Sequence, residues 1–161
     1  MWEARTQHKE KTAVQLGDLV SGVRDLCGGT TDQEDLSELA GIREKLQGKK
    51  KKTTTPEEAR NEVEKMLRTI KGIGPGVVGI FLRRVQADWG EVFPFADERG
   101  LRAARSFGLV KEGEGARELM EAVGTDSGDE GRRRYVKVLD TLVGLDLEKK
   151  VEEGMKMAGL E

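Results

Sequence analysis

The chain has 161 residues, a length usual for one domain, and charged and hydrophobic residues each make up 36% of it. Lysine and arginine number 28 and aspartate and glutamate 30, which gives a formal net charge of −2. A net charge this close to zero argues against a protein that coats nucleic acid indiscriminately, but it leaves room for a local basic face.

Cysteine and histidine each occur once, as Cys27 and His8. A disulfide framework within the chain is therefore excluded, and a metal site built from cysteine and histidine is nearly so. No stretch approaches the roughly 20 apolar residues of a membrane span, and residues 1–11 lack the apolar core of a secretory signal. We expect an intracellular protein without a membrane partner, in the nucleus if the source is eukaryotic and otherwise in the cytoplasm.

Two helices are predicted in an N-terminal helical segment, residues 1–48. Apolar residues recur at helical spacing over 12–27 until two glycines end the pattern, and a shorter run of the same kind covers 34–46. Residues 49–55, four lysines followed by three threonines, are typical of a linker. The lysine run is either a solvated loop or a short nuclear-import or phosphate-attracting patch.

Residues 56–161 are predicted to form a second helical domain, which has a clear helix start. Thr55 suits the N-cap, Pro56 the first helical position, and Glu58 completes a capping box. Further helices are predicted over 97–105, 115–123, 130–144 and 147–158. We find no internal repeat and no strand pattern, so the predicted fold class is all-α, a helical bundle.

The most informative segment is a run of glycines between two helical patterns, Ile-Lys-Gly-Ile-Gly-Pro-Gly-Val at residues 70–77, here called the glycine hairpin. A short turn of this kind exposes backbone N–H groups where the second helix begins, and such an N-terminus attracts phosphate. The alternative is a tight helix–helix turn in which the glycines only permit positive φ. The spacing Gly74-x-Gly76-x-x-Gly79 also matches the dinucleotide-binding fingerprint, but a helical pattern rather than a strand precedes it, so we reject that match.

The glycine hairpin and the residues after it resemble the helix-hairpin-helix (HhH-GPD) DNA glycosylase superfamily, the base-excision repair group that contains endonuclease III and adenine glycosylase. Lys71-Gly72-Ile73-Gly74-Pro75-Gly76 is similar to the hairpin of that family, whose usual form is a hydrophobic residue, proline, glycine, a hydrophobic residue and glycine. Ile80–Gln86 and Phe93–Arg99 extend the resemblance, which covers about residues 57–110. It implies that DNA is the partner and that one strand is held by Lys71, Gly72, Ile73, Gly74, Pro75 and Gly76.

The resemblance also implies a catalytic residue. In that family an essential aspartate begins a helix after the hairpin, and Asp97 stands at that place in the order of elements. Such a carboxylate would stabilise a developing oxocarbenium cation and orient water. Gly76 occupies the position at which strand-cleaving members carry a lysine, so the resemblance implies a monofunctional DNA N-glycosylase without lyase activity. Judged from the residues alone, Asp97 is better explained as an ordinary N-cap.

We predict no cofactor. Several members of the family carry an iron–sulfur cluster on four C-terminal cysteines, and Cys27 alone excludes one here. The resemblance leaves open a metal ion at the hairpin, which we do not predict. Because the segment before the hairpin is short for the family, we expect an N-terminally shortened member whose base pocket is incomplete. A non-catalytic DNA-binding module and a helical interaction domain with a purely structural glycine turn therefore stay open as alternatives.

Arginine and aromatic side chains after the hairpin have two interpretations each. The arginines either bind phosphate or pair with nearby acids, and they are Arg83, Arg84, Arg99, Arg102 and Arg105, with Arg132, Arg133 and Arg134 further on. Trp89 and Phe93 either wedge into a base stack or pack in the core, and we favour the core. We expect Cys27 to be a small buried side chain at a helix end.

Overall fold

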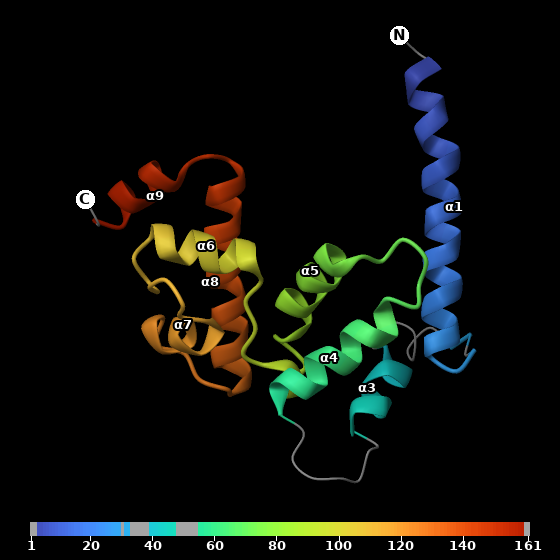
Figure 1. Cartoon of the computed structure of the whole chain (residues 1–161), viewed down its shortest axis with the longest axis horizontal. Coiled ribbons are helices and arrows are strands. Elements are labelled where there is room, and N and C mark those ends of the chain that lie inside the picture. The colour runs from blue at the N-terminus through green and yellow to red at the C-terminus, as the bar shows by residue number, and fades with distance from the viewer. Residues whose placement is uncertain (1–2, 30, 33–38, 48–54, 160–161) are drawn as a thin grey trace. The chain divides into compact units, whose positions relative to one another are not determined.

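A computed structural model describes residues 3–29, 31–32, 39–47, 55–159 of the chain. These residues form helices and turns without a strand, which confirms the all-α class (Figure 1). They divide into two compact units, Met1–Val78 and Gly79–Glu161, with the division inside one helix. The predicted linker falls mostly on residues outside the described ranges, so the predicted domain boundary stays a prediction.

The first unit contains α1 (Glu3–Leu26), α3 (Ala40–Gln47), α4 (Pro56–Leu67) and the start of α5 (Pro75–Val85). Its buried apolar residues are Cys27, Ile42, Ala59, Val63, Leu67, Ile70 and Val78. These residues come from α3, α4, the start of α5, the hairpin and the position just after α1, so the turn after α4 is anchored by the same core that packs the helices.

Close backbone approaches hold this unit together. A Cβ added at Gly22 of α1 would lie 2.7 Å from Cγ1 of Ile70, so only glycine lets α1 pack against the start of the hairpin. A Cβ at Gly41 of α3 would lie 2.5 Å from the Cα of Cys27, just beyond the end of α1. The Lys45 ammonium also donates to the carbonyl of Leu26 at 3.0 Å, which caps the C-terminus of α1.

The second unit contains the rest of α5, a 3-10 turn at Gly90–Val92, α6 (Glu98–Ser106), α7 (Ala116–Ala122), α8 (Asp129–Leu147) and α9 (Val151–Met157). α6, α7 and α9 pack on one another or on α8 around a core formed by Phe93, Ala103, Ala104, Phe107, Val110, Leu119, Tyr135, Leu139 and Leu142. The rings of Phe93 and Tyr135 meet edge to face at 5.3 Å, and the Tyr135 hydroxyl donates to the carbonyl of Ala116 at 3.1 Å. The buried phenol is therefore satisfied.

Local signals account for the helix starts. Thr55 Oγ1 accepts the N–H of Glu58 at 3.2 Å, and the Glu58 carboxylate accepts the N–H of Thr55 at 2.9 Å, which confirms the predicted capping box. Before α7, the Gly115 N–H donates to the Glu118 carboxylate at 2.9 Å, and this bond lowers the pKa of Glu118. Gly108, with φ +68°, follows the end of α6.

Helix bounds differ from the predicted ones where no local signal marks them. α1 begins at Glu3 rather than near residue 12, through a polar stretch without an apolar pattern. The final helix begins at Val151 rather than 147, after Lys149 adopts φ +58°. The predicted helix over 34–46 corresponds to α3, and its residues 34–38 lie outside the described ranges.

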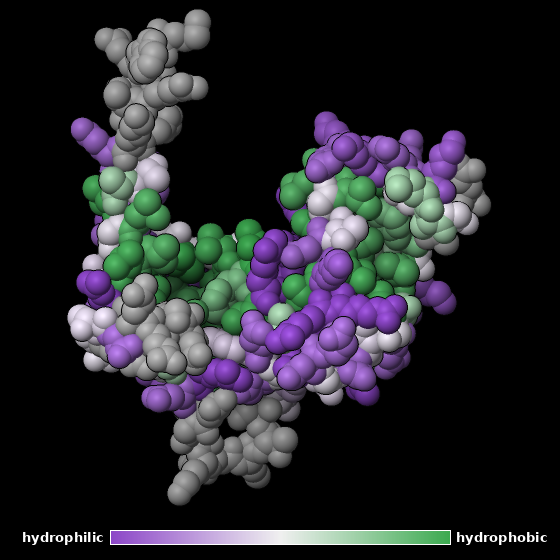
Figure 2. Space-filling view, turned by 180° about the vertical axis from the view of Figure 1, so that it is seen from behind, coloured by the Kyte–Doolittle hydropathy of each residue, from purple (hydrophilic) through white to green (hydrophobic). Residues whose placement is uncertain are grey.

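Apolar side chains remain on the surface of the first unit. Figure 2 shows hydrophobic surface on the described part of α1, where Val14, Leu16 and Val20 are exposed. Among the described residues, no helix is both long enough and apolar enough to span a membrane.

Candidate functional site

The glycine hairpin is a tight turn between α4 and α5. The N–H of Ile73 donates to the carbonyl of Ile70 at 3.1 Å, and Gly72 has φ +91°, where glycine is strongly favoured. The N–H groups of Val77 and Val78 both donate to the carbonyl of Gly74, at 3.0 and 3.1 Å. Gly74 therefore immediately precedes the first turn of α5, which runs from Pro75 to Val85.

Amide groups at this helix start are free. Among the hydrogen bonds of the described residues, none has the N–H of Gly72, Gly74 or Gly76 as its donor. Gly74 and Gly76 do not have positive φ, and a Cβ added at either would meet nothing within 4 Å. Neither backbone strain nor crowding within the chain explains these two glycines. Backbone N–H groups left bare by missing side chains are what a closely approaching anion requires.

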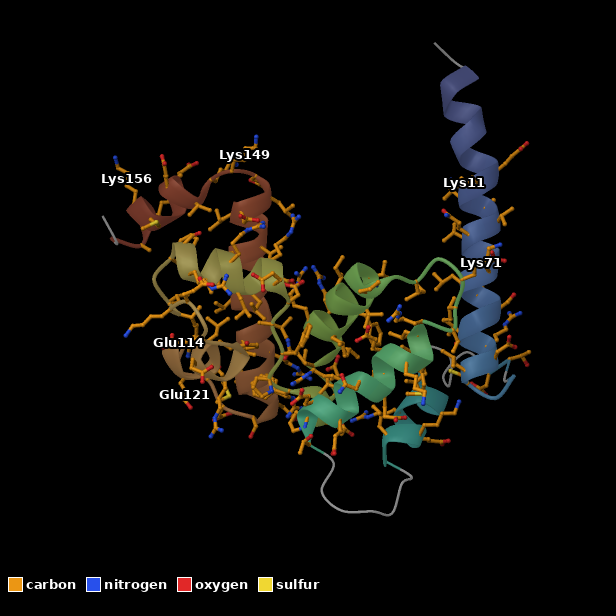
Figure 3. All side chains as sticks on the ribbon, in the orientation of Figure 1. Lys11, Lys71, Glu114, Glu121, Lys149 and Lys156 are labelled. Carbon is orange, nitrogen blue, oxygen red and sulfur yellow. The ribbon has the colours of Figure 1, made fainter. Side chains whose placement is uncertain are left out.

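The hairpin lysine lies beside α1. Lys71 Nζ is 3.7 Å from a carboxylate oxygen of Asp18, and Figure 3 shows Lys71 next to α1 and Lys11 further along that helix. A cavity of about 410 Å³ lies at this junction, lined by Glu10, Lys11, Val14, Gln15, Asp18, Lys71 and Gly72. The surroundings of the hairpin are thus of mixed charge. Sequence reasoning missed the contact with Asp18, because the residues lie far apart in the chain.

Asp97 begins α6 in the second unit, and both of its carboxylate oxygens are engaged. Oδ1 accepts the N–H of Gly100 at 2.8 Å, which makes Asp97 the N-cap of α6. Oδ2 accepts from Nη1 of Arg83 at 2.7 Å, and the Arg83 side chain is only 8% exposed. The carboxylate is therefore held by α5 and α6 together, and its role in this structure is to cap one helix and neutralise a buried cation.

Arg83 is the centre of a charge cluster that we call the Arg83 cluster: Arg83, Arg84, Asp97 and Asp140. Nε of Arg83 lies 3.4 Å from Oδ1 of Asp140 on α8, and Nη2 of Arg84 lies 3.2 Å from Oδ2 of the same carboxylate. Two guanidinium groups and two carboxylates balance in charge. A buried guanidinium needs such compensation, because an unpaired charge in the interior is very costly.

Gln86 fixes the segment that leads to Asp97. It is fully buried, and its amide nitrogen donates to the carbonyls of Arg83 and Phe95, both at 2.9 Å. Its amide oxygen accepts the N–H of Phe95 at 2.8 Å. A side chain just after the end of α5 thus holds the extended segment before α6.

The other arginines mostly pair with acids, which is the interpretation that opposed phosphate binding. Arg102 lies 2.8 Å from Asp146, Arg105 lies 3.3 Å from Glu98 and 3.5 Å from Glu112, and Arg132 lies 2.7 Å from Asp129. Trp89 and Phe93 are each 4% exposed and Cys27 is 9% exposed, so the prediction that they are buried is confirmed.

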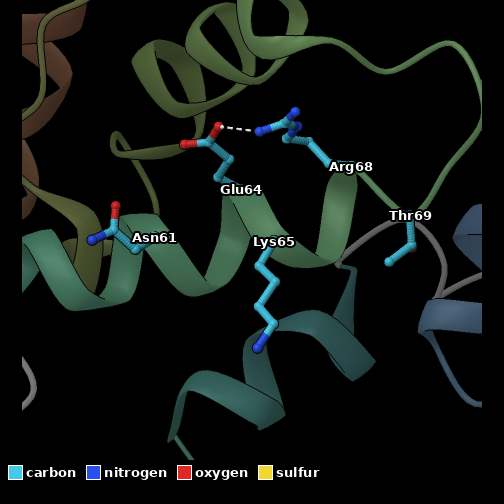
Figure 4. A pocket seen from close by; sticks show the side chains of 5 residues that line it. All are labelled: Asn61, Glu64, Lys65, Arg68 and Thr69. Atoms are coloured by element: carbon cyan, nitrogen blue, oxygen red, sulfur yellow. Dashed lines mark hydrogen bonds and ion pairs between the residues drawn. The ribbon is translucent and has the colours of Figure 1, made fainter.

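The side chains that line a cavity on α4 are not arranged for catalysis. The cavity has a volume of about 460 Å³ and is lined by Asn61, Glu64, Lys65, Arg68 and Thr69. Figure 4 shows Arg68 paired with Glu64, at 3.4 Å, while Lys65 points to the other side of the helix. Within the described part of the chain, no three histidine, cysteine, aspartate or glutamate side chains gather as a metal site would require.

No family model, no curated protein and no solved structure matches this chain. The resemblance to the helix-hairpin-helix glycosylases therefore stays a prediction. The roles of Asp97 and of the hairpin residues Lys71–Gly76 have to be judged from their own surroundings.

Asp97→Asn tests the structural role of this carboxylate. Asparagine keeps an oxygen that can accept the Gly100 N–H but removes the charge opposite Arg83, so we expect the free energy of unfolding to fall by about 1.5–3 kcal/mol. Urea denaturation followed by circular dichroism measures the change. As control, Glu98→Gln alters an exposed neighbour and should stay within about 0.5 kcal/mol of wild type. Equal stability of Asp97→Asn and wild type would contradict the assigned role.

Proposed function

We propose that this chain binds the phosphate backbone of DNA through the glycine hairpin, without excising a base. The observation that carries the proposal is the set of free N–H groups at Gly72, Gly74 and Gly76, two of them at glycines that the fold itself does not require. The resemblance to helix-hairpin-helix proteins supports DNA as the nucleic acid.

The distribution of charge along α4 also favours the hairpin as the phosphate site. Three acidic residues, Glu57, Glu58 and Glu62, lie in its first part with one cation, Arg60. After Glu64, the charged residues towards and within the hairpin are Lys65, Arg68 and Lys71. The partial positive charge at the start of α5 adds to these cations. A phosphate at the hairpin would therefore meet backbone donors together with the exposed side chain of Lys71.

The state of Asp97 favours binding over catalysis. A glycosylase carboxylate has to face the sugar of an extruded nucleotide, whereas the two oxygens of Asp97 accept from Gly100 and Arg83. To act on a substrate, the carboxylate would have to leave a buried cation. We therefore place base excision second, as the proposal that Asp97 is the catalytic residue of a monofunctional glycosylase.

Replacing Gly74 and Gly76 together by alanine separates a ligand role from a folding role. The added methyl groups meet nothing and φ is not positive at either residue. Alanine is the better helix former in place of Gly76 but the poorer N-cap in place of Gly74, so the free energy of unfolding should change by less than about 1 kcal/mol. The same methyl groups hold a phosphate away from the amides, so we expect affinity for duplex DNA to fall about tenfold or more. Fluorescence anisotropy at low salt measures the affinity.

Gly144→Ala is the matched control for this double variant. Gly144 lies in α8, and a Cβ there also meets nothing within 4 Å, so DNA affinity should not change. Unchanged DNA affinity in the double variant would show that the hairpin is not the contact. A wild-type chain that binds no DNA at low salt would leave only a structural role for the turn.

Lys71 and Asp18 are expected to change DNA binding in opposite directions. If Lys71 contacts phosphate, Lys71→Met should lower the slope of log affinity against log salt by about one. Asp18→Asn removes the carboxylate beside Lys71 and should raise affinity about two- to fivefold, the range of an exposed ion pair. Glu44→Gln removes the same charge from α3 and serves as control. A salt slope that Lys71→Met leaves unchanged would exclude this lysine from the contact.

Base release decides between the two candidate functions. Duplexes that carry uracil, an alkylated base or an oxidised base are incubated with wild type and with Asp97→Asn, and abasic sites are cleaved by alkali and counted. We expect no release by either protein above a protein-free blank. If the wild type releases a base and the folded Asp97→Asn variant does not, Asp97 is catalytic, and the proposal that the chain only binds DNA is wrong.

A further inference from the structure

An apolar stripe on α1 runs from the core of the first unit out into solvent. Ala13, Leu16, Val20 and Val23 follow one another at alternating spacings of three and four, which is the pattern of a helix–helix seam. Val23 is partly buried, whereas Leu16 is 56% exposed and Val20 is 50% exposed. Hydrophobic surface is visible on this part of the helix in Figure 2. The exposed half of the stripe has no partner surface among the described residues.

Gly17 lies in the middle of this exposed half. Glycine in a helix interior is unfavourable by about 1 kcal/mol relative to alanine. Its φ is not positive, and a Cβ at this position would meet nothing within 4 Å. Neither the backbone conformation nor the packing of the described residues therefore requires glycine here. A glycine beside an apolar seam does, however, let the backbone of another helix come close.

Charged residues flank the seam symmetrically about Gly17. Glu10 and Arg24 are both exposed, and Gly17 is midway between them, one heptad from each. Neither has an ion-pair partner within the described ranges. If two copies of α1 pair antiparallel about Gly17, Glu10 of each copy comes level with Arg24 of the other. A parallel pair would instead place like charges at the same height.

We propose that α1 is a self-association surface that pairs antiparallel with α1 of a second copy of this chain, with Gly17 at the two-fold axis. Leu16 of each copy then packs beside Val20 of the other, as an isologous interface requires. The two Glu10–Arg24 pairs close the ends of the contact. Glu10 also lines the cavity beside Lys71 and Gly72, so one end of this surface borders the hairpin. The pairing itself does not depend on the proposed DNA binding.

Sedimentation equilibrium of the full chain tests the proposal, from about 1 to about 500 µM protein. We expect a concentration-dependent dimer. Glu10→Arg replaces both attractive pairs by repulsive ones and should raise the dissociation constant about tenfold, and adding Arg24→Glu to it should restore the wild-type value. Asp25→Arg, a charge reversal off the seam of α1, is the matched control and should leave the dissociation constant unchanged. A monomer at every concentration, or a dimer that Glu10→Arg does not weaken, overturns the proposal.

Gly17→Ala provides an independent test that loss of folding cannot mimic. Alanine should raise helix content or thermal stability of the monomer, because it is the better helix former. Its methyl group stands between the two backbones, so the dissociation constant of the dimer should rise at the same time. Stronger association together with the more stable helix would show that α1 pairs in some other way, and would overturn the antiparallel arrangement.

Discussion

The burial of one arginine constrains the second unit. The side chain of Arg83 is 8% exposed, and a guanidinium cannot lose its proton to escape the interior. Its charge is therefore compensated by two carboxylates, that of Asp97 at the start of α6 and that of Asp140 on α8. Because these residues belong to three different elements, satisfying a single charge fixes where the second half of α5, α6 and α8 stand relative to one another.

The segment between α5 and α6 is fixed in the same way. Gln86 is fully buried, and its side-chain amide hydrogen-bonds both the N–H and the carbonyl of Phe95. These are the two bonds that a neighbouring strand would otherwise make to an extended residue. Phe93, just before it, packs edge to face on Tyr135 in the core. Asp97 is thus delivered to Arg83 by a segment that is held on both sides.

The hairpin presents the opposite situation. Its apolar residue Ile70 is buried, but the amides of Gly72, Gly74 and Gly76 have no partner among the described residues. Lys71 makes an exposed contact with Asp18. Polar groups that satisfy one another stabilise the fold and are withdrawn from chemistry, whereas polar groups left open at the surface are available to a ligand. This difference is why the proposed function rests on the hairpin and not on Asp97.

Local signals in the sequence were sufficient to predict the turn and those helix ends that such signals mark. The capping box at Thr55 and Glu58, and the glycines with positive φ at Gly72 and Gly108, act within a few residues, so they can be recognised without the fold. The early start of α1 and the late start of α9 lacked such signals. Only the tertiary structure decided that Arg83 pairs with Asp97 and Asp140 and that Lys71 meets Asp18. Those partners are far apart in the chain, and which charges meet is set by helix packing, which no local pattern encodes.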